Sequence, residues 1–96
     1  MRPSEALQFR REALVALVRA HGASRLRVFG SVARGQDHEG SDVDLLVDMP
    51  AGASLLQLVG LHLALQDALG APVDLCTERE LHPLLRDRIL AEARAV

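Results

Sequence analysis

The segment from residue 42 to residue 76 constrains the fold most, because it holds two strand patterns joined by a stretch of helical length. Apolar and acidic side chains alternate over 42–48, as in a strand with one buried face. Residues 54–69 are rich in leucine and begin at Ser54, a favourable helix N-cap. Residues 73–76 form a second apolar strand pattern. A strand, a helix and a strand in this order predict two parallel strands joined by a right-handed crossover.

The rest of the chain adds elements on both sides of this unit. The other expected elements are, in chain order, a helix over 4–21, a strand over 25–29, a short helical turn over 32–34, a polar surface loop over 35–40 and an amphipathic helix over 80–95. Ser4 is the expected N-cap of the first helix. Since the connection between the first two strands is short, it can reverse the chain direction. The pattern therefore predicts an α/β (α+β) domain with a mixed three-stranded sheet.

Length and composition narrow the class of protein. The chain has 96 residues, of which 49% are hydrophobic and 25% charged, so we expect one globular domain over 1–96 rather than a disordered chain. A net charge of -2 and only two aromatic residues argue against binding to long nucleic acid. Cys76 is the only cysteine, which excludes an intrachain disulfide, and no stretch reaches the roughly 18 apolar residues that a membrane span needs. These features favour the cytoplasm.

The residues that suggest chemistry lie between residues 30 and 74. Gly30 and Ser31 follow a predicted strand and precede a helical turn, where backbone N–H groups and a hydroxyl can converge on a phosphate. Asp42 and Asp44 share one face of the next strand and suit a hard divalent cation. If the third strand lies beside this one in parallel, Asp74 completes a site of three carboxylates, the arrangement of two-metal catalysis.

Structural roles for the same residues remain open at this level. Ser31 can be a helix N-cap, and Asp42 and Asp44 can belong to a solvated sheet face. Asp74 can be an ordinary exposed strand residue. An Asp-x-Asp pair alone occurs by chance in roughly one 100-residue chain in three or four. The pair gains specificity because ten residues separate it from Gly-Ser and because a third aspartate lies on a strand.

These residues resemble the signature of the nucleotidyltransferase superfamily that includes DNA polymerase beta, and especially its minimal nucleotidyltransferases. That signature is Gly-Ser, ten residues, Asp-x-Asp and a later strand-borne aspartate, and it is matched here in full by the residues named above. The element order matches as well, so the resemblance covers nearly the whole chain. It implies a sheet with strand order 1-2-3.

The resemblance also implies an activity: attack of a hydroxyl on the α-phosphorus of a nucleoside triphosphate, with ATP as the expected donor. Asp42, Asp44 and Asp74 would then be catalytic and would hold two Mg²⁺ ions, with Mn²⁺ as the alternative, and Asp74 would help to deprotonate the acceptor. Gly30 and Ser31 would bind the β- and γ-phosphates. Arg34 matches the arginine of the family's Gly-Ser-x-Ala-Arg-Gly run and could also reach a phosphate, although it could equally bind helix carbonyls and solvent.

Minimal nucleotidyltransferases resembling this chain act as antitoxins paired with HEPN-domain toxins, and some transfer AMP to a toxin tyrosine. The resemblance therefore favours a HEPN-type protein partner. Two alternatives remain: an antitoxin that only occludes its partner, and nucleotidyl transfer to a small molecule or an RNA end. The leucines of helix 54–69 lie nearly all round it, so either the fold buries both sides or part of the helix meets another chain. We expect Cys76 to be a small buried residue and 37–39 to be ordinary loop residues.

Overall fold

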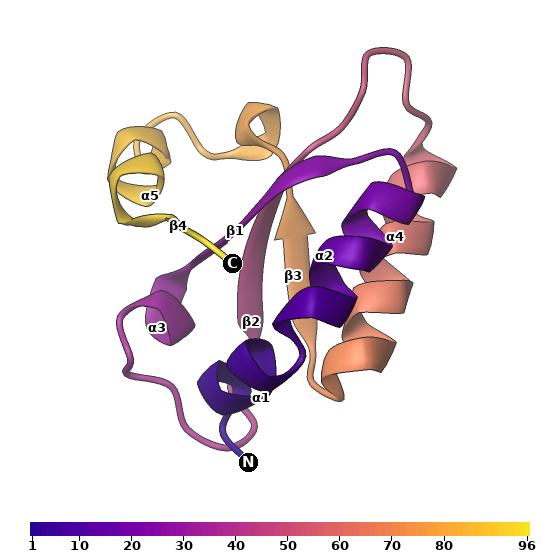
Figure 1. Ribbon diagram of the computed structural model, residues 1–96. Helices are drawn as coiled ribbons and strands as arrows, with labels where there is room; N and C mark the ends of the chain where they lie inside the picture. The colour runs from indigo at the N-terminus through magenta and orange to yellow at the C-terminus, as the bar shows by residue number, and fades with distance from the viewer.

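The computed structural model describes residues 1–96 and contains a four-stranded mixed sheet of order β3-β2-β1-β4 (Figure 1). β1 is antiparallel to both β2 and β4, whereas β2 and β3 are parallel. The strands are β1 (Ser24–Phe29), β2 (Val43–Asp48), β3 (Val73–Cys76) and β4 (Arg94–Ala95). The helices are α1 (Pro3–Phe9), α2 (Arg11–Ala20), α3 (Gly30–Ala33), α4 (Leu55–Leu69), the 3-10 helix η1 (Glu78–Glu80) and α5 (Arg86–Glu92). The expected order of the first three strands is confirmed.

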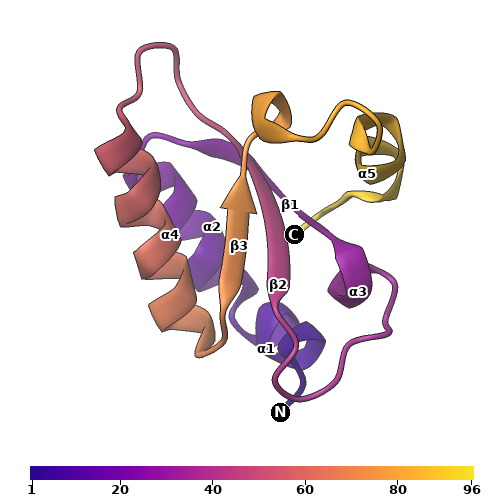
Figure 2. The ribbon, with the colours of Figure 1, turned by 180° about the vertical axis from the view of Figure 1, so that it is seen from behind.

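Helices α2 and α4 lie side by side on one face of the sheet, and Figures 1 and 2 show this layer from its two sides. Val43, Leu45 and Val47 of β2 are fully buried against it, as their alternation predicts. We call the other side, which faces the viewer in Figure 2, the open face of the sheet. Leu46 points to this open face and is nevertheless fully buried, because Phe29 and Leu81 pack around it.

The strand–helix–strand unit has the predicted form. Ser54 is the N-cap of α4, and its hydroxyl accepts a hydrogen bond of 3.2 Å from the Gln57 amide. The helix ends at Gly70, whose φ of +67° is in the left-handed region that favours glycine. The fold itself buries one side of the helix, while Leu55, Leu56, Val59 and Leu63 are exposed. No helix of the chain is both long and apolar enough to cross a membrane.

The predicted single helix over 4–21 is wrong, because the chain breaks it at Arg10, whose φ is -100° and ψ 11°. Ser4 is also not the N-cap, since the helix begins one residue earlier, at Pro3. Proline favours the first helical position because it lacks an N–H and its φ is already helical. The N-cap is Arg2, whose amide donates a hydrogen bond of 2.8 Å to the Glu5 carboxylate.

The loop over 35–40 is not a surface loop throughout, because its Asp37 is buried. The Asp37 carboxylate accepts hydrogen bonds of 2.9 Å from the Ser4 amide and from the Arg2 guanidinium. Burial alone would raise the pKa of Asp37, but these hydrogen bonds outweigh it and lower the pKa below its ordinary value. The carboxylate therefore fastens the start of α1 to the loop that leads into β2.

The predicted helix over 80–95 is also wrong. η1, an irregular stretch, the short α5 and β4 take its place, and β4 extends the expected three-stranded sheet to four. Pro83 lacks an N–H donor and restricts the residue before it, which opposes a continuous helix. Thr77 and Glu80 stabilise η1, since the Thr77 amide donates a hydrogen bond of 2.9 Å to the Glu80 carboxylate.

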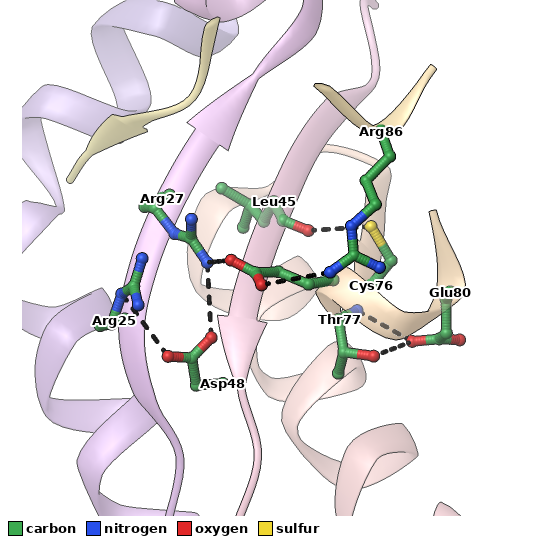
Figure 3. A network of polar contacts seen from close by, with 9 residues as sticks. Arg25, Arg27, Leu45, Asp48, Cys76, Thr77, Glu80 and Arg86 are labelled. Atoms are coloured by element: carbon green, nitrogen blue, oxygen red, sulfur yellow. Dashed lines mark hydrogen bonds and ion pairs between the residues drawn. The ribbon is translucent and has the colours of Figure 1, made fainter. Parts of the chain in front are cut away.

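Ion pairs attach this C-terminal segment to the open face (Figure 3). The Arg27 guanidinium of β1 donates hydrogen bonds to Asp48 (3.4 Å) and to Glu78 of η1 (3.1 Å). Arg86, the first residue of α5, lies 3.8 Å from the other Glu78 oxygen, and Arg25 lies 3.5 Å from Asp48. The two Glu78 pairs and the buried Leu81 hold η1 and α5 against the open face, and β4 is placed by its pairing with β1.

Candidate functional site

The turn after β1 is built around a glycine that no other residue could replace without strain. Gly30 has a φ of +74°, and a Cβ added to it would lie 2.1 Å from the Asp44 carboxylate oxygen Oδ2. The sheet causes this close approach, because Phe29 of β1 pairs with Asp44 of β2 in the antiparallel register. The backbone of Gly30 and the carboxylate of Asp44 therefore face each other directly.

Two further carboxylates lie near Asp44: Asp74 on β3 and Asp42 just before β2. Asp44 pairs with Asp74 in the parallel register, and both side chains point to the open face because their neighbours Val43 and Val73 point to the core. Asp42 lies just before β2 and is exposed. Partial burial raises the pKa of Asp44 above its ordinary value, and the negative charges of Asp74 and Asp42 raise it further. The three carboxylates thus crowd one corner of the open face.

The donor set of this corner fits a divalent cation. Carboxylate oxygens are the ligands that Mg²⁺ and Mn²⁺ prefer, and a cation would relieve the repulsion that raises the pKa of Asp44. The side chains do not form a ready-made cluster of three ligands around one point. Asp42 and Asp74 are exposed, whereas Asp44 is half-buried.

Ser31 is the second residue of α3, and its position excludes one of the two roles that its sequence context allows. The N-cap of this helix is Phe29, so the interpretation of Ser31 as a helix cap is wrong. The helix begins at Gly30, two residues before the predicted start, because the left-handed φ of this glycine turns the chain sharply out of β1. Ser31 is half-buried and lies next to the Gly30 backbone.

Arg34 is the C-cap of α3, and its side chain contacts Glu92, a residue that the sequence did not suggest for the site. Its guanidinium donates a hydrogen bond to Oε1 of Glu92, the last residue of α5, and another of 2.9 Å to Gln36. The other Glu92 oxygen, Oε2, accepts a hydrogen bond of 3.3 Å from the Gly30 amide. The sequence offers no signal for this contact, because 62 residues separate Gly30 from Glu92 and the local pattern predicts Glu92 within a continuous helix.

A family match over most of the chain shows which family it belongs to. The sequence model of the nucleotidyltransferase domain family matches residues 10–96. The chain belongs to this nucleotidyltransferase family. A solved structure described as that of a minimal nucleotidyltransferase shares 50% identity with it and superposes with a TM-score of 0.85, over 97% of this chain and 95% of the other.

Relatives of this nucleotidyltransferase carry names that specify the activity further. A Methanocaldococcus jannaschii protein named as a protein adenylyltransferase is 46% identical over 83% of this chain and 86% of its own length. The protein adenylyltransferase MntA of Thermococcus cleftensis is 39% identical over 74% of this chain and 72% of its own length. A toxin–antitoxin structure with AMP-PNP shares the fold, with a TM-score of 0.74 and 23% identity over 88% of this chain and 69% of the other. This chain is an enzyme of the same family.

Cys76 lies on the same strand face as Asp74 and is half-buried rather than fully buried. Burial, followed by the negative charge of Asp74, raises the pKa of its thiol to about 11. Because the thiolate is the nucleophilic form, the thiol is inert at neutral pH. Cys76 packs against the small apolar cluster of the open face, which is the structural role that we expected for it.

The nucleotidyltransferase also has a surface hollow of about 530 Å³ away from the carboxylates. It lies between the β2–α4 loop and η1, with Met49, Pro50 and Leu58 among its lining residues. It is therefore at the far end of β2 from Asp42 and Asp44. None of the three carboxylates nor the Gly30 turn lines it, so it is not part of the candidate site.

Proposed function

We propose that this nucleotidyltransferase transfers AMP from ATP to a hydroxyl group of a partner protein and thereby acts as an antitoxin. The observation that carries the proposal is the pairing of Asp44 with Asp74 directly opposite the Gly30 turn. A group that binds phosphate and a group that binds cations thus face each other across one corner of the sheet. This is the arrangement that in-line displacement at phosphorus needs.

The reaction forms a bond between the acceptor oxygen and the α-phosphorus and breaks the bond between this phosphorus and the oxygen that leads to the β-phosphate. Pyrophosphate leaves, and the acceptor proton passes to the Asp74 carboxylate. The Gly30 amide, the Ser31 hydroxyl and Arg34 bind the β- and γ-phosphates, while Asp42, Asp44 and Asp74 would hold the divalent cations. Two Mg²⁺ ions, or Mn²⁺ in their place, supply charge neutralisation at the α-phosphate and the leaving group.

A protein acceptor is supported by the relatives, because those with high coverage are named as protein adenylyltransferases. The toxin–antitoxin complexes among the structural neighbours support a toxin as this acceptor. The resemblance to minimal nucleotidyltransferases favours a HEPN-domain toxin. The exposed carboxylates Asp42 and Asp74 leave the acceptor side of the site open to such a partner in the cytoplasm, where ATP and Mg²⁺ are abundant.

Calorimetric titration with ATP tests the nucleotide site. We expect the wild type to bind ATP in the presence of Mg²⁺, and the double variant Asp42→Asn, Asp44→Asn to bind it at least about tenfold more weakly, a change of about 1.4 kcal/mol. The variant should melt no lower than the wild type without metal. Ionised Asp44 destabilises the fold as the pH rises through its raised pKa, and the asparagine removes this cost.

The matched control is the double variant Glu12→Gln, Asp67→Asn, which removes two negative charges from exposed positions on α2 and α4. It should bind ATP as the wild type does, because the lost charges are not near the site. Equal ATP affinity in the wild type and the Asp42→Asn, Asp44→Asn variant would mean that these carboxylates do not form the nucleotide site.

A further inference from the structure

The place of Glu92 is set by the short strand that follows it. β4 is antiparallel to β1, with Arg94 opposite Val28. The same register brings Gly30, two residues after Val28, opposite Glu92, two residues before Arg94. The Val96 amide continues the pairing with a hydrogen bond of 3.0 Å to the Leu26 carbonyl oxygen. Glu92 thus reaches the turn after β1 because the sheet holds its backbone there.

The Glu92 carboxylate engages two donors that the proposed function assigns to the nucleotide. Its two oxygens accept hydrogen bonds from the Gly30 amide and from the Arg34 guanidinium. A carboxylate and a phosphate are both anions with more than one acceptor oxygen, and arginine and backbone amides bind either. The Glu92 side chain is 21% exposed, so water screens its charge only in part. Glu92 therefore uses the two donors that a pair of phosphate oxygens would use.

The charge balance of the site makes this contact more than a surface ion pair. Glu92 adds a fourth carboxylate to the corner that already holds Asp42, Asp44 and Asp74, and it contributes to the raised pKa of Asp44. Burial would raise the pKa of Glu92 itself, but the hydrogen bonds from Arg34 and Gly30 lower it, so the group is ionised at neutral pH. The negative charge of Glu92 therefore lies on Gly30 and Arg34, the groups proposed to bind the phosphates, and it repels a polyphosphate that enters the site.

We propose that Glu92 is an internal competitor of the nucleotide: its carboxylate holds Gly30 and Arg34 in the free protein, and the β- and γ-phosphates bind after the Glu92 side chain has turned away. This inference rests on the proposed function and adds a residue that sets its nucleotide affinity. The turn requires only side-chain rotation, since Glu92 is the last residue of α5 and β4 keeps its backbone in place. A competing contact lowers the apparent affinity by the fraction of molecules in which the site is free.

The opposite role would give the opposite result. If Glu92 oriented Arg34 for the phosphate, its neutralisation would weaken nucleotide binding. If it competes, neutralisation strengthens binding. Glu92→Gln separates the two, because glutamine keeps the size of the side chain and can still accept one of the hydrogen bonds, so that the fold and the reach of Arg34 are preserved.

The experiment is a calorimetric titration of the wild type, Glu92→Gln and Glu12→Gln with ATP and Mg²⁺, and separately with inorganic triphosphate and Mg²⁺. Glu12 is an exposed residue of α2 and controls for the loss of one negative charge. We expect Glu92→Gln to bind both ligands about three- to tenfold more tightly than the wild type, and Glu12→Gln to bind them as the wild type does. Inorganic triphosphate should show the same ratio as ATP, because the competition concerns phosphate alone.

The outcomes separate this inference from the function on which it rests. If the wild type binds ATP and Glu92→Gln binds it with equal or lower affinity, the competitor role is wrong. The proposed nucleotidyltransferase site is not affected by that result. A gain for ATP without a gain for inorganic triphosphate also overturns it, because the competition would then not concern the phosphates. If none of the three proteins binds ATP, both the proposed function and the competitor role are wrong.

Discussion

Asp74→Asn is expected to lower the kcat of nucleotidyl transfer by at least about a hundredfold, equivalent to about 2.7 kcal/mol in the barrier, while changing ATP affinity much less. Asp74 is exposed on β3 and lies in register with Asp44, on the side where an acceptor can approach. Asparagine has the same shape but cannot accept the acceptor proton and is a poorer cation ligand. Since the side chain is exposed, the substitution should leave the melting temperature within a few degrees of the wild type.

Steady-state kinetics with ATP and the partner protein, together with calorimetric ATP titration, separate the two effects. The control is Asp67→Asn, which removes an exposed carboxylate from α4 and should leave kcat unchanged. A kcat of Asp74→Asn within about threefold of the wild type would mean that Asp74 is an ordinary exposed strand residue, an alternative that its position in the sequence allows.

Gly30→Ala is expected to abolish most of the activity because it disturbs the phosphate turn and a catalytic carboxylate together. Its Cβ would lie 2.1 Å from Oδ2 of Asp44, so one of the two groups must move. The φ of +74° adds backbone strain of about 1–2 kcal/mol for any residue with a Cβ. We expect a loss of at least about a hundredfold in kcat/KM, since a displacement of about 1 Å at a reacting centre can have this effect.

Gly35→Ala is the matched control for this substitution. Gly35 has a nearly equal φ of +70°, but an added Cβ there meets no atom within 4 Å. Both variants should therefore lose about 1–2 kcal/mol of unfolding free energy from backbone strain, measured by denaturant titration, while only Gly30→Ala loses activity. Similar kcat/KM values in the two variants would show that the approach of Asp44 to Gly30 has no part in catalysis.

Local patterns made part of this fold predictable. The alternation over 42–48 identified which side chains of β2 point to the core, and Ser54 identified the start of α4. Both signals depend on neighbouring residues alone. The strand–helix–strand unit then required β2 and β3 to be parallel, which is why the pairing of Asp44 with Asp74 could be expected before the structure was known.

Contacts between residues that lie far apart in the sequence could not be predicted from local patterns. Asp37 looked like a loop residue because its partners, Arg2 and Ser4, lie more than 30 positions away. Glu92 looked like part of a continuous helix because β4 is only two residues long and gains its stability from pairing with β1. Propensity carries no information on such pairing, so local patterns could not predict these contacts.

Label transfer tests the central claim most directly. The protein is incubated with Mg²⁺ and the protein encoded beside it, using ATP labelled at the α-phosphorus in one reaction and at the γ-phosphorus in another. We predict that the α-label appears on the partner and the γ-label in released pyrophosphate. Mass spectrometry should find one or more AMP units on a tyrosine, serine or threonine, and the double variant Asp42→Asn, Asp44→Asn should abolish the transfer.

A stable complex without α-label on the partner, together with full neutralisation of the partner by the same double variant, would contradict this account and leave inhibition by occlusion. Labelling of RNA ends or small hydroxylated molecules in place of the partner would contradict the protein acceptor.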